Sequence, residues 1–147
     1  MAIVLDGMGS DTYPAPEIEA AVLAAEELGE EIILVGQQEL LEPRLKAANP
    51  RGLPVRIVHA PDVLEMGDKA VESTRKKPNN SMAIGMELVR TGEAQAFVTA
   101  GSTGAAMFNA IKILRCMQGV LRPALVSPVP TRTGRCSFRD TGANADC

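Results

Sequence analysis

Four short segments of this chain hold most of the side chains that could do chemistry. They lie at or near the ends of apolar runs and are rich in small polar residues: DGMGSD (6–11), RKKPNNSM (75–82), TAGSTGA (99–105) and DTGANAD (140–146). Glycine allows a close approach to the backbone, and hydroxyl, amide and carboxylate groups can hydrogen-bond a ligand or move a proton. These residue types favour the binding of an anion with carboxylates close by.

TAGSTGA is the barest of the four segments. It follows the apolar run AFV (96–98) and precedes a helical pattern that begins near Thr103. Backbone N–H groups at a helix N-terminus attract anions, so Gly101 and Gly104, with the hydroxyls of Ser102 and Thr103, could form an anion cradle. The same residues would suit a helix cap and tight packing, and this segment alone does not decide between the two. It matches neither the dinucleotide nor the Walker A pattern.

RKKPNNSM brings three adjacent cations, Arg75, Lys76 and Lys77, before Pro78. Most such runs are solvated surface. The functional alternative is that Lys76 or Lys77 folds over a phosphate or a developing oxyanion. Asn80 or Ser81 would cap the helix that follows, which predicts a second possible anion-binding terminus.

Carboxylates flank the glycines of the other two segments. Asp6 ends a predicted strand, whereas Asp11 could equally cap the next turn, and Asp140 and Asn144 occupy the last segment. A metal site is not expected, because no third oxygen ligand is evident beside Asp6 and Asp11 and the three cysteines are far apart. We interpret His59, the only histidine, as a structural loop residue, because no nucleophile motif accompanies it.

The elements that must position these residues alternate between strand and helix. Short apolar runs at 2–5, 32–35, 55–58 and 96–98 lack polar alternation, as is typical of parallel strands buried on both faces. Helical patterns cover 16–29, 37–48 (disturbed by Pro43) and 80–91, and a fourth starts near 103. The expected inward residues are Ile18, Ala21, Val22, Ala25 and Leu28 in the first (with Glu17 on the wet side), Met82, Met86 and Val89 in the third, and Met107, Phe108, Ile111 and Leu114 in the fourth. This alternation predicts an α/β layered domain with a mostly parallel sheet, whose strand ends would gather the four segments.

The last part of the chain departs from this alternation. Strands are expected at 124–130 and 135–138, joined by a turn, and the sequence then ends in a loop-like string. We therefore expect residues 1–147 to be a single α/β domain that forms a fragment of a longer chain.

Charge and composition exclude several classes of function. A net charge of −3 and 3% aromatic residues leave little to bind nucleic acid. The first residues lack the pattern of a signal peptide, and no apolar run reaches the length of a membrane helix. A cytoplasmic protein is expected, with peripheral membrane contact left open.

The motifs, taken in order, resemble those of the phosphate acyltransferase family of bacterial phospholipid synthesis, commonly called PlsX. The resemblance covers essentially the whole chain, which corresponds to about the first half of the family's sequence; it rests on AIVLDGMGSD, IILVG, VRIVHAPDVLEMGDK, RKKPNNSMAIGMELV, AFVTAGSTGA, RPAL and DTGANADC. The chain departs from the family's usual residues at Ser10, Thr12, Ser102 and 137–139.

The resemblance implies both a fold and an activity. The fold would be a three-layer αβα sandwich similar to phosphotransacetylases and to isocitrate and isopropylmalate dehydrogenases. The activity would be transfer of a fatty acyl group from acyl carrier protein to inorganic phosphate, which gives an acyl phosphate and requires no cofactor. Family members are typically homodimers that associate peripherally with the membrane.

That chemistry suits the residues identified above. Phosphate must be held, aligned and brought to a thioester carbonyl whose oxyanion is stabilised. Phosphate-binding candidates are Lys76, Lys77, Asp11, Ser81, Gly101, Ser102, Thr103 and Gly104. Asp6, Asp11 or Asp140 could orient phosphate or accept its proton, and Asn144 could donate to the oxyanion.

Three alternatives stay open at this point. One is a phosphate acyltransferase that takes coenzyme A thioesters. Another is a non-catalytic fragment that binds a ligand or partner, and we expect the isolated segment to be inactive or nearly so. A nucleotide-dependent dehydrogenase is disfavoured, because the dinucleotide fingerprint is missing.

Overall fold

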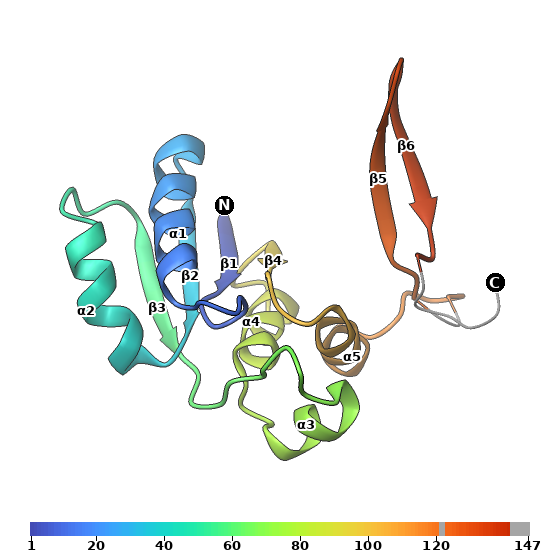
Figure 1. The fold of residues 1–147 in the computed structure, drawn as a ribbon, viewed down its shortest axis with the longest axis horizontal. Helices are drawn as coiled ribbons and strands as arrows, with labels where there is room; N and C mark the ends of the chain where they lie inside the picture. Colours follow the sequence, from blue (N-terminus) through green and yellow to red (C-terminus); the bar gives the residue numbers. More distant parts are fainter. Residues whose placement is uncertain (121–122, 142–147) are drawn as a thin grey trace. The chain divides into compact units, whose positions relative to one another are not determined.

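A computed structural model of the chain describes residues 1–120 and 123–141. Its main sheet consists of four parallel strands: β1 (Ala2–Asp6), β2 (Glu31–Gly36), β3 (Val55–His59) and β4 (Ala96–Val98). The order across the sheet is β3-β2-β1-β4 (Figure 1). In the register, Ile3 lies opposite both Ile32 and Ala96, and Ile32 lies opposite Val55. The four predicted strands are confirmed to within a residue or two.

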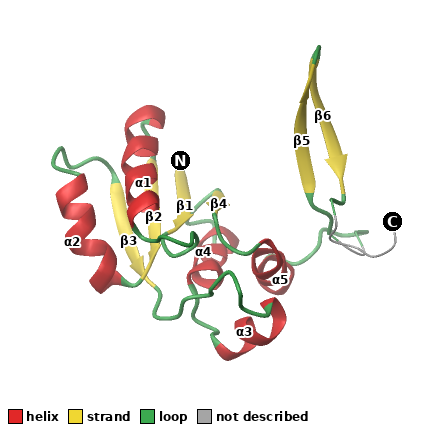
Figure 2. Ribbon diagram, in the orientation of Figure 1, coloured by secondary structure: helices red, strands yellow, loops and turns green. Residues whose placement is uncertain are grey.

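Helices cover both faces of this sheet (Figure 2). On one face α1 (Ala15–Leu28) and α2 (Gln38–Ala48) pack over Ile32 and Leu34. On the other face α4 (Ser81–Arg90) packs over Val4 and Ile33. The central strands β1 and β2 are therefore covered from both sides, as unbroken apolar runs predict, whereas β3 and β4 are only partly buried. The three-layer αβα architecture is confirmed.

One glycine allows α4 to approach the sheet closely. A Cβ atom on Gly85 would lie 2.5 Å from the Phe97 ring and 3.0 Å from Val4 Cγ1, so a larger residue would push the helix away from β1 and β4. Two further helices, α3 (Ala70–Lys76) and α5 (Thr103–Ile113), pack against each other, and α5 also packs against α4. Leu64, Met82 and Ala105 form the small core at that junction.

Several details of the helices differ from the sequence prediction. In α1, Leu28 was expected inside but is 57% exposed. α2 continues without a break through Pro43, because Leu41 and Leu45 are buried on either side of it and anchor the helix. α3 was not predicted, because its seven residues end in a charged run of the kind that is usually solvated surface. In α5 the buried side chains are Ala105 and Asn109, whereas two of the residues expected inside, Ile111 and Leu114, are exposed.

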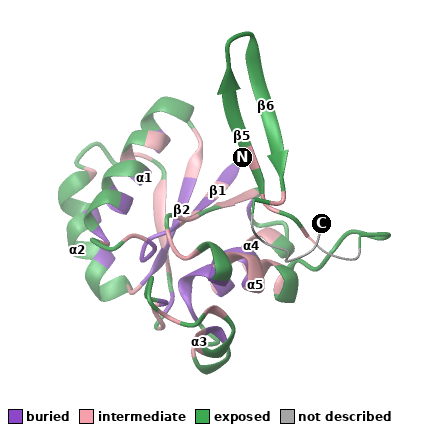
Figure 3. Ribbon diagram, turned by 45° about the vertical axis from the view of Figure 1, so that its right-hand side comes forward, coloured by how far each residue is buried: buried purple, intermediate pink, exposed green. Residues whose placement is uncertain are grey.

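Residues 115–147 form a second compact unit, separate from the unit of residues 1–114. It contains an antiparallel hairpin of β5 (Val126–Thr131) and β6 (Gly134–Arg139), which confirms the two strands expected there. Figure 3 shows that this hairpin is almost wholly exposed, while the buried residues of the first unit lie on β1, β2 and the helices. The single domain expected over residues 1–147 stays a prediction.

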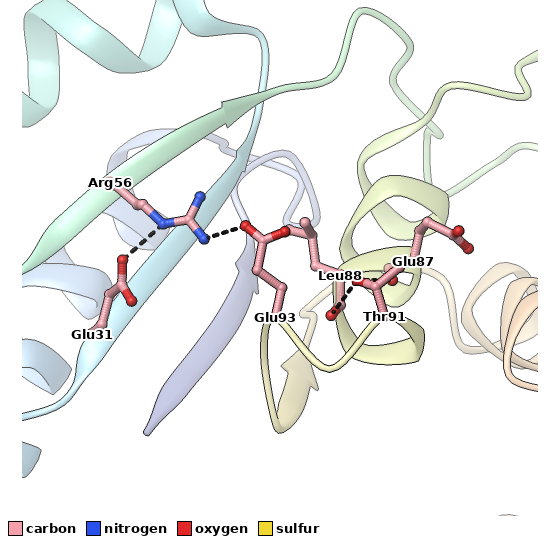
Figure 4. A network of polar contacts seen from close by, with 6 residues as sticks. All are labelled: Glu31, Arg56, Glu87, Leu88, Thr91 and Glu93. Atoms are coloured by element: carbon pink, nitrogen blue, oxygen red, sulfur yellow. Dashed lines mark hydrogen bonds and ion pairs between the residues drawn. The ribbon is translucent and has the colours of Figure 1, made fainter.

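Ion pairs gather at the amino ends of the strands. Arg56, near the start of β3, lies 2.7 Å from Glu31 at the start of β2 and 2.8 Å from Glu93 before β4 (Figure 4). All three side chains are well exposed, so the pairs add little stability. They mark the edge of the sheet opposite to the chemically suggestive segments. Within residues 1–120 and 123–141, no helix is long and apolar enough to cross a membrane.

Candidate functional site

The connections between strands create a switch point beside β1. From β1 the chain runs to β2 and then β3 on one side, and it returns to β4 on the other side of β1 (Figure 1). The segments after β1 and β4 therefore leave the sheet next to each other but in different directions. In open α/β sheets, ligands bind in the crevice that such a reversal creates at the carboxyl ends of the strands.

Asp6 joins the two segments that flank this switch point. The Gly101 N–H donates to Thr99 Oγ1 at 2.9 Å, and the Thr99 hydroxyl donates to Asp6 Oδ2 at 2.7 Å. The other carboxylate oxygen, Oδ1, accepts the Met8 N–H at 3.0 Å. Asp6 is 1% exposed, so both oxygens are used inside the protein. Its carboxylate holds the loops after β1 and β4 together.

Burial raises the pKa of Asp6 above its ordinary value of 3.8, because a charged carboxylate loses its hydration there. Hydrogen bonds from the side chains of Ser81 and Thr99 and from the Met8 N–H lower the pKa, whereas the negative charge of Glu17 raises it. The ionised form thus depends on its donors. Removing one of them should raise the pKa further.

Two glycines allow the loops to touch. A Cβ atom on Gly9 would lie 2.9 Å from the Gly101 nitrogen and 2.9 Å from Thr99 Oγ1. A Cβ atom on Gly101 would lie 3.2 Å from the Gly9 carbonyl oxygen and 2.6 Å from the end of Met82. Only glycine fits at position 9 without moving the opposite backbone. The small residues of DGMGSD and TAGSTGA therefore serve close packing of the two loops.

The helix that begins in TAGSTGA leaves two amides free. Ser102 is the N-cap of α5, and its Oγ accepts the Ala105 N–H at 3.4 Å while its carbonyl accepts the Ala106 N–H. The N–H groups of Thr103 and Gly104 have no acceptor among the described residues, as expected for the first turn of a helix. Both residues are exposed. This end of α5 can accept an anion.

The start of α4 is arranged differently. Asn80 is the N-cap, and its side chain accepts the Ala83 N–H at 2.9 Å and donates to the Lys77 carbonyl at 2.7 Å. Ser81 is 2% exposed, and hydrogen bonding by its hydroxyl lowers the pKa of the Asp6 carboxyl. The predicted cap is confirmed. This helix terminus is buried, so it is not open to a ligand as the start of α5 is. Binding of phosphate by Ser81 stays a prediction.

The predicted cations have protein partners in this structure. The Lys77 ammonium donates to the Val63 carbonyl at 2.7 Å and to Asp68 at 2.8 Å, which closes the loop before α3. Lys76 is paired with Glu72 at 2.7 Å on the exposed side of α3. Asp11 is exposed on the loop after β1. None of the three is brought to the Asp6 cluster by a contact between described residues.

Of the two remaining predicted site residues, one belongs to the second unit. Asp140 follows β6, and its N–H donates to the Leu125 carbonyl at 2.6 Å. Asn144 lies outside the described residues. Their proposed roles stay predictions.

The structure adds two residues that the sequence did not single out. Thr99 lies within TAGSTGA but before the helix, whereas the predicted site residues Ser102 and Thr103 begin the helix. Glu17, expected on the wet side of α1, is instead 4% exposed, and its Oε1 accepts the Ser10 N–H at 2.9 Å. Glu17 therefore anchors the far end of the loop after β1. Its spacing of four residues from Ala21 and eight from Ala25 places Glu17 on the buried face of α1, and that spacing was the available signal.

Two further observations bear on other chemistry. No group of three histidine, cysteine or acidic residues could hold a metal ion in the part of the chain that the structure describes. His59 accepts the Gln38 N–H at 3.3 Å through Nδ1, at the start of α2. That contact fits the structural role predicted for it.

Comparison with known proteins adds a family. The model of the family described as fatty acid synthesis protein matches residues 1–147. The phosphate acyltransferase of Koribacter versatilis is 48% identical, with 100% of this chain aligned to 42% of that protein. The phosphate acyltransferase of Acidobacterium capsulatum is 47% identical, with 99% of this chain aligned to 43% of that protein. That of Geobacter sulfurreducens is 41% identical, with 100% of this chain aligned to 42% of that protein. The chain spans less than half the length of these curated relatives.

Proposed function

The chain belongs to the fatty acid synthesis protein family, and on that premise we propose that it forms the phosphate-binding part of a phosphate acyltransferase in lipid synthesis. The proposed donor is a fatty acyl thioester of acyl carrier protein, and the proposed acceptor is inorganic phosphate. The observation that carries this proposal is the pair of exposed, unpaired amides of Thr103 and Gly104 at the switch point of the sheet. The names of the relatives support the reaction class.

The cradle would hold phosphate at the start of α5. The N–H groups of Thr103 and Gly104 point out of the first turn, and the positive end of the helix dipole favours an anion there. The hydroxyls of Ser102 and Thr103 would supply further donors. Asp6 acts indirectly. It accepts the Thr99 hydroxyl, which in turn accepts the Gly101 N–H, and this fixes the path of the backbone into α5. We therefore assign Asp6, Thr99 and Ser81 as positioning residues.

The reaction asks for little beyond positioning and charge stabilisation. A phosphate oxygen attacks the carbonyl carbon of the thioester, and a C–O bond forms as the carbonyl oxygen becomes an oxyanion. The C–S bond then breaks, which releases acyl phosphate and a thiolate that takes up a proton. A site that replaces the hydration water of the phosphate dianion with N–H donors and aligns it with the carbonyl carbon can supply a large part of the barrier reduction.

Further parts of the proposal rest on the family resemblance. Asp140 remains the candidate for orienting phosphate or accepting its proton, and Asn144 the candidate for donating to the oxyanion. Homodimer formation, a cytoplasmic location and peripheral association with the membrane belong to the same proposal. They concern the full-length protein.

The test is formation of acyl phosphate by the full-length protein that carries these residues. Acyl carrier protein thioester and phosphate are incubated with hydroxylamine, which converts acyl phosphate into a hydroxamate. We expect hydroxamate in amounts that rise and saturate with phosphate, above the slow background that thioester and hydroxylamine give alone. The same series with the coenzyme A thioester identifies the preferred donor. A full-length protein that gives only the background rate with both donors would contradict the proposal.

A further inference from the structure

The outward face of α3 is a basic surface on an acidic protein. Its exposed cations are Lys69, Arg75 and Lys76, and its single carboxylate is Glu72. Lys76 is paired with Glu72, whereas Lys69 and Arg75 have no acidic partner among the described residues. The chain as a whole carries a net charge of −3. This face therefore concentrates positive charge that the fold itself does not use.

The same face also exposes an apolar side chain. Val71 is 46% exposed and, with the cations, lines a shallow hollow of about 570 Å³. The inner side of the helix carries its packing, since Thr74 is fully buried. Protein interfaces combine an apolar centre with charges of complementary sign around it. A partner that fits this surface presents carboxylates around an apolar side chain.

This surface lies beside the proposed phosphate cradle. α3 packs against α5, and a Cβ atom on Gly104 would lie 3.4 Å from Ala70 Cβ. The amide of Gly104 is one of the two that the cradle offers. The outward face of α3 is therefore only about one helix diameter, roughly 10 Å, from the start of α5. A protein bound there could reach the cradle with a flexible acyl thioester arm.

We propose that the outward face of α3, formed by Lys69, Val71, Arg75 and Lys76, docks the acidic carrier protein that delivers the acyl thioester. This inference rests on the proposed function. It assigns the basic run at 75–77 two separate tasks: Arg75 and Lys76 face the carrier, and Lys77 closes the loop behind them. Electrostatic attraction would speed association and weaken as salt is added.

The test uses the full-length protein with Lys69→Glu and Arg75→Glu combined. The matched control combines Arg44→Glu and Lys46→Glu, which make the same charge change on exposed residues of α2. Binding of an acidic acyl carrier protein is measured directly, at low and at high ionic strength. We expect the α3 variant to bind at least about tenfold more weakly than wild type and to lose most of the salt dependence, while the control keeps both.

Kinetics separate docking from an effect on the cradle. With the carrier thioester the α3 variant should lose about tenfold in kcat/KM, while an uncharged S-acyl pantetheine should be used within about twofold of the wild-type rate. Equal losses with both donors would overturn the inference, and so would carrier binding that is absent in wild type or unchanged in the variant. Unchanged carrier binding with loss of binding to phosphatidylglycerol vesicles would assign the surface to the membrane instead. Hydroxamate formation at the background rate with every donor would refute the proposed function. The direct binding measurement would still test whether the α3 surface docks the carrier protein.

Discussion

Replacing Thr99 by valine should break the link between the two loops of the site. Valine has nearly the same shape but no hydroxyl, so Asp6 Oδ2 loses its donor at 2.7 Å and the Gly101 N–H loses its acceptor at 2.9 Å. The rest of the cluster, including the bond from the Met8 N–H to Asp6, can stay in place. The substitution therefore tests the relay itself.

The expected loss of stability follows from these two bonds. A hydrogen bond to a buried charged group contributes about 1.5–3 kcal/mol, and Thr99 is only half-buried, so we take about 1.5 kcal/mol for the bond to Asp6. The bond from the Gly101 N–H adds about 0.5 kcal/mol. The free energy of unfolding should fall by about 2 kcal/mol at neutral pH.

The loss should also depend on pH, with a definite sign. The folded-state pKa of Asp6 already lies above 3.8, so ionisation of this group costs stability as the pH rises through that pKa. Thr99 lowers the pKa, and its removal raises the pKa further, which increases this cost. Well below 3.8 the carboxyl group is protonated in both the folded and unfolded states, and only the weaker neutral bonds are lost. The variant should therefore differ from wild type more at neutral pH than in acid.

The assay is urea denaturation of wild type, Thr99→Val and Thr99→Ser between about pH 3 and about pH 8. Thr99→Ser keeps the hydroxyl and should show little of the pH-dependent loss. In an Asp6→Asn background the effect of Thr99→Val should no longer vary with pH. A loss that is constant across the pH range, or a serine variant as impaired as the valine variant, would refute the assignment of Thr99 as the donor to Asp6.

Three other substitutions probe the same region. Gly9→Ala should separate the loops after β1 and β4 and raise the KM for phosphate about tenfold or more. The control is Gly67→Ala, whose added methyl group meets no atom within 4 Å and should leave the KM unchanged. Equal kinetics for the two variants would contradict the close approach of the loops. Lys77→Met should speed amide hydrogen exchange across residues 63–68, measured by mass spectrometry with Lys77→Arg as the conservative control, and unchanged exchange would show that the lysine does not close that loop. Ser102→Ala should lower the free energy of unfolding by about 1 kcal/mol through loss of the α5 cap, and Ser102→Asn should restore that stability. An alanine variant as stable as wild type in urea denaturation would rule out the cap.

The strands were predictable because burial on both faces leaves a direct mark in sequence. Runs such as IILV show no polar alternation, and in the structure 32–35 is buried throughout. The helix α1 was predictable for a similar reason, since its apolar spacing follows one face and Gly29 ends it. Their order along the chain then indicated the carboxyl edge of the sheet as the place for a site.

The contacts that organise the site were not predictable. Asp6 and Thr99 are 93 residues apart, and no local pattern says that they meet. Glu17 lies on the same face of α1 as Ala21 and Ala25, but its bond with the Ser10 N–H depends on the path of the loop after β1. The sequence suggested that DGMGSD and TAGSTGA come together, and their contact confirms this. It could not show that Lys76 and Lys77 have protein partners of their own.

The most direct test of the phosphate cradle is the phosphate dependence of Thr103→Pro in the full-length protein. Thr103 is the first residue of α5, where proline fits without breaking the helix, and Ser102 before it has the extended backbone that proline requires (φ −57°, ψ 117°). Proline deletes one cradle N–H, whereas Thr103→Ala keeps it and removes only the hydroxyl. We predict that the KM for phosphate rises roughly 10- to 100-fold for proline and much less for alanine, at unchanged thermal stability. A KM for phosphate that is the same in the two variants would contradict the claim that this helix terminus holds phosphate.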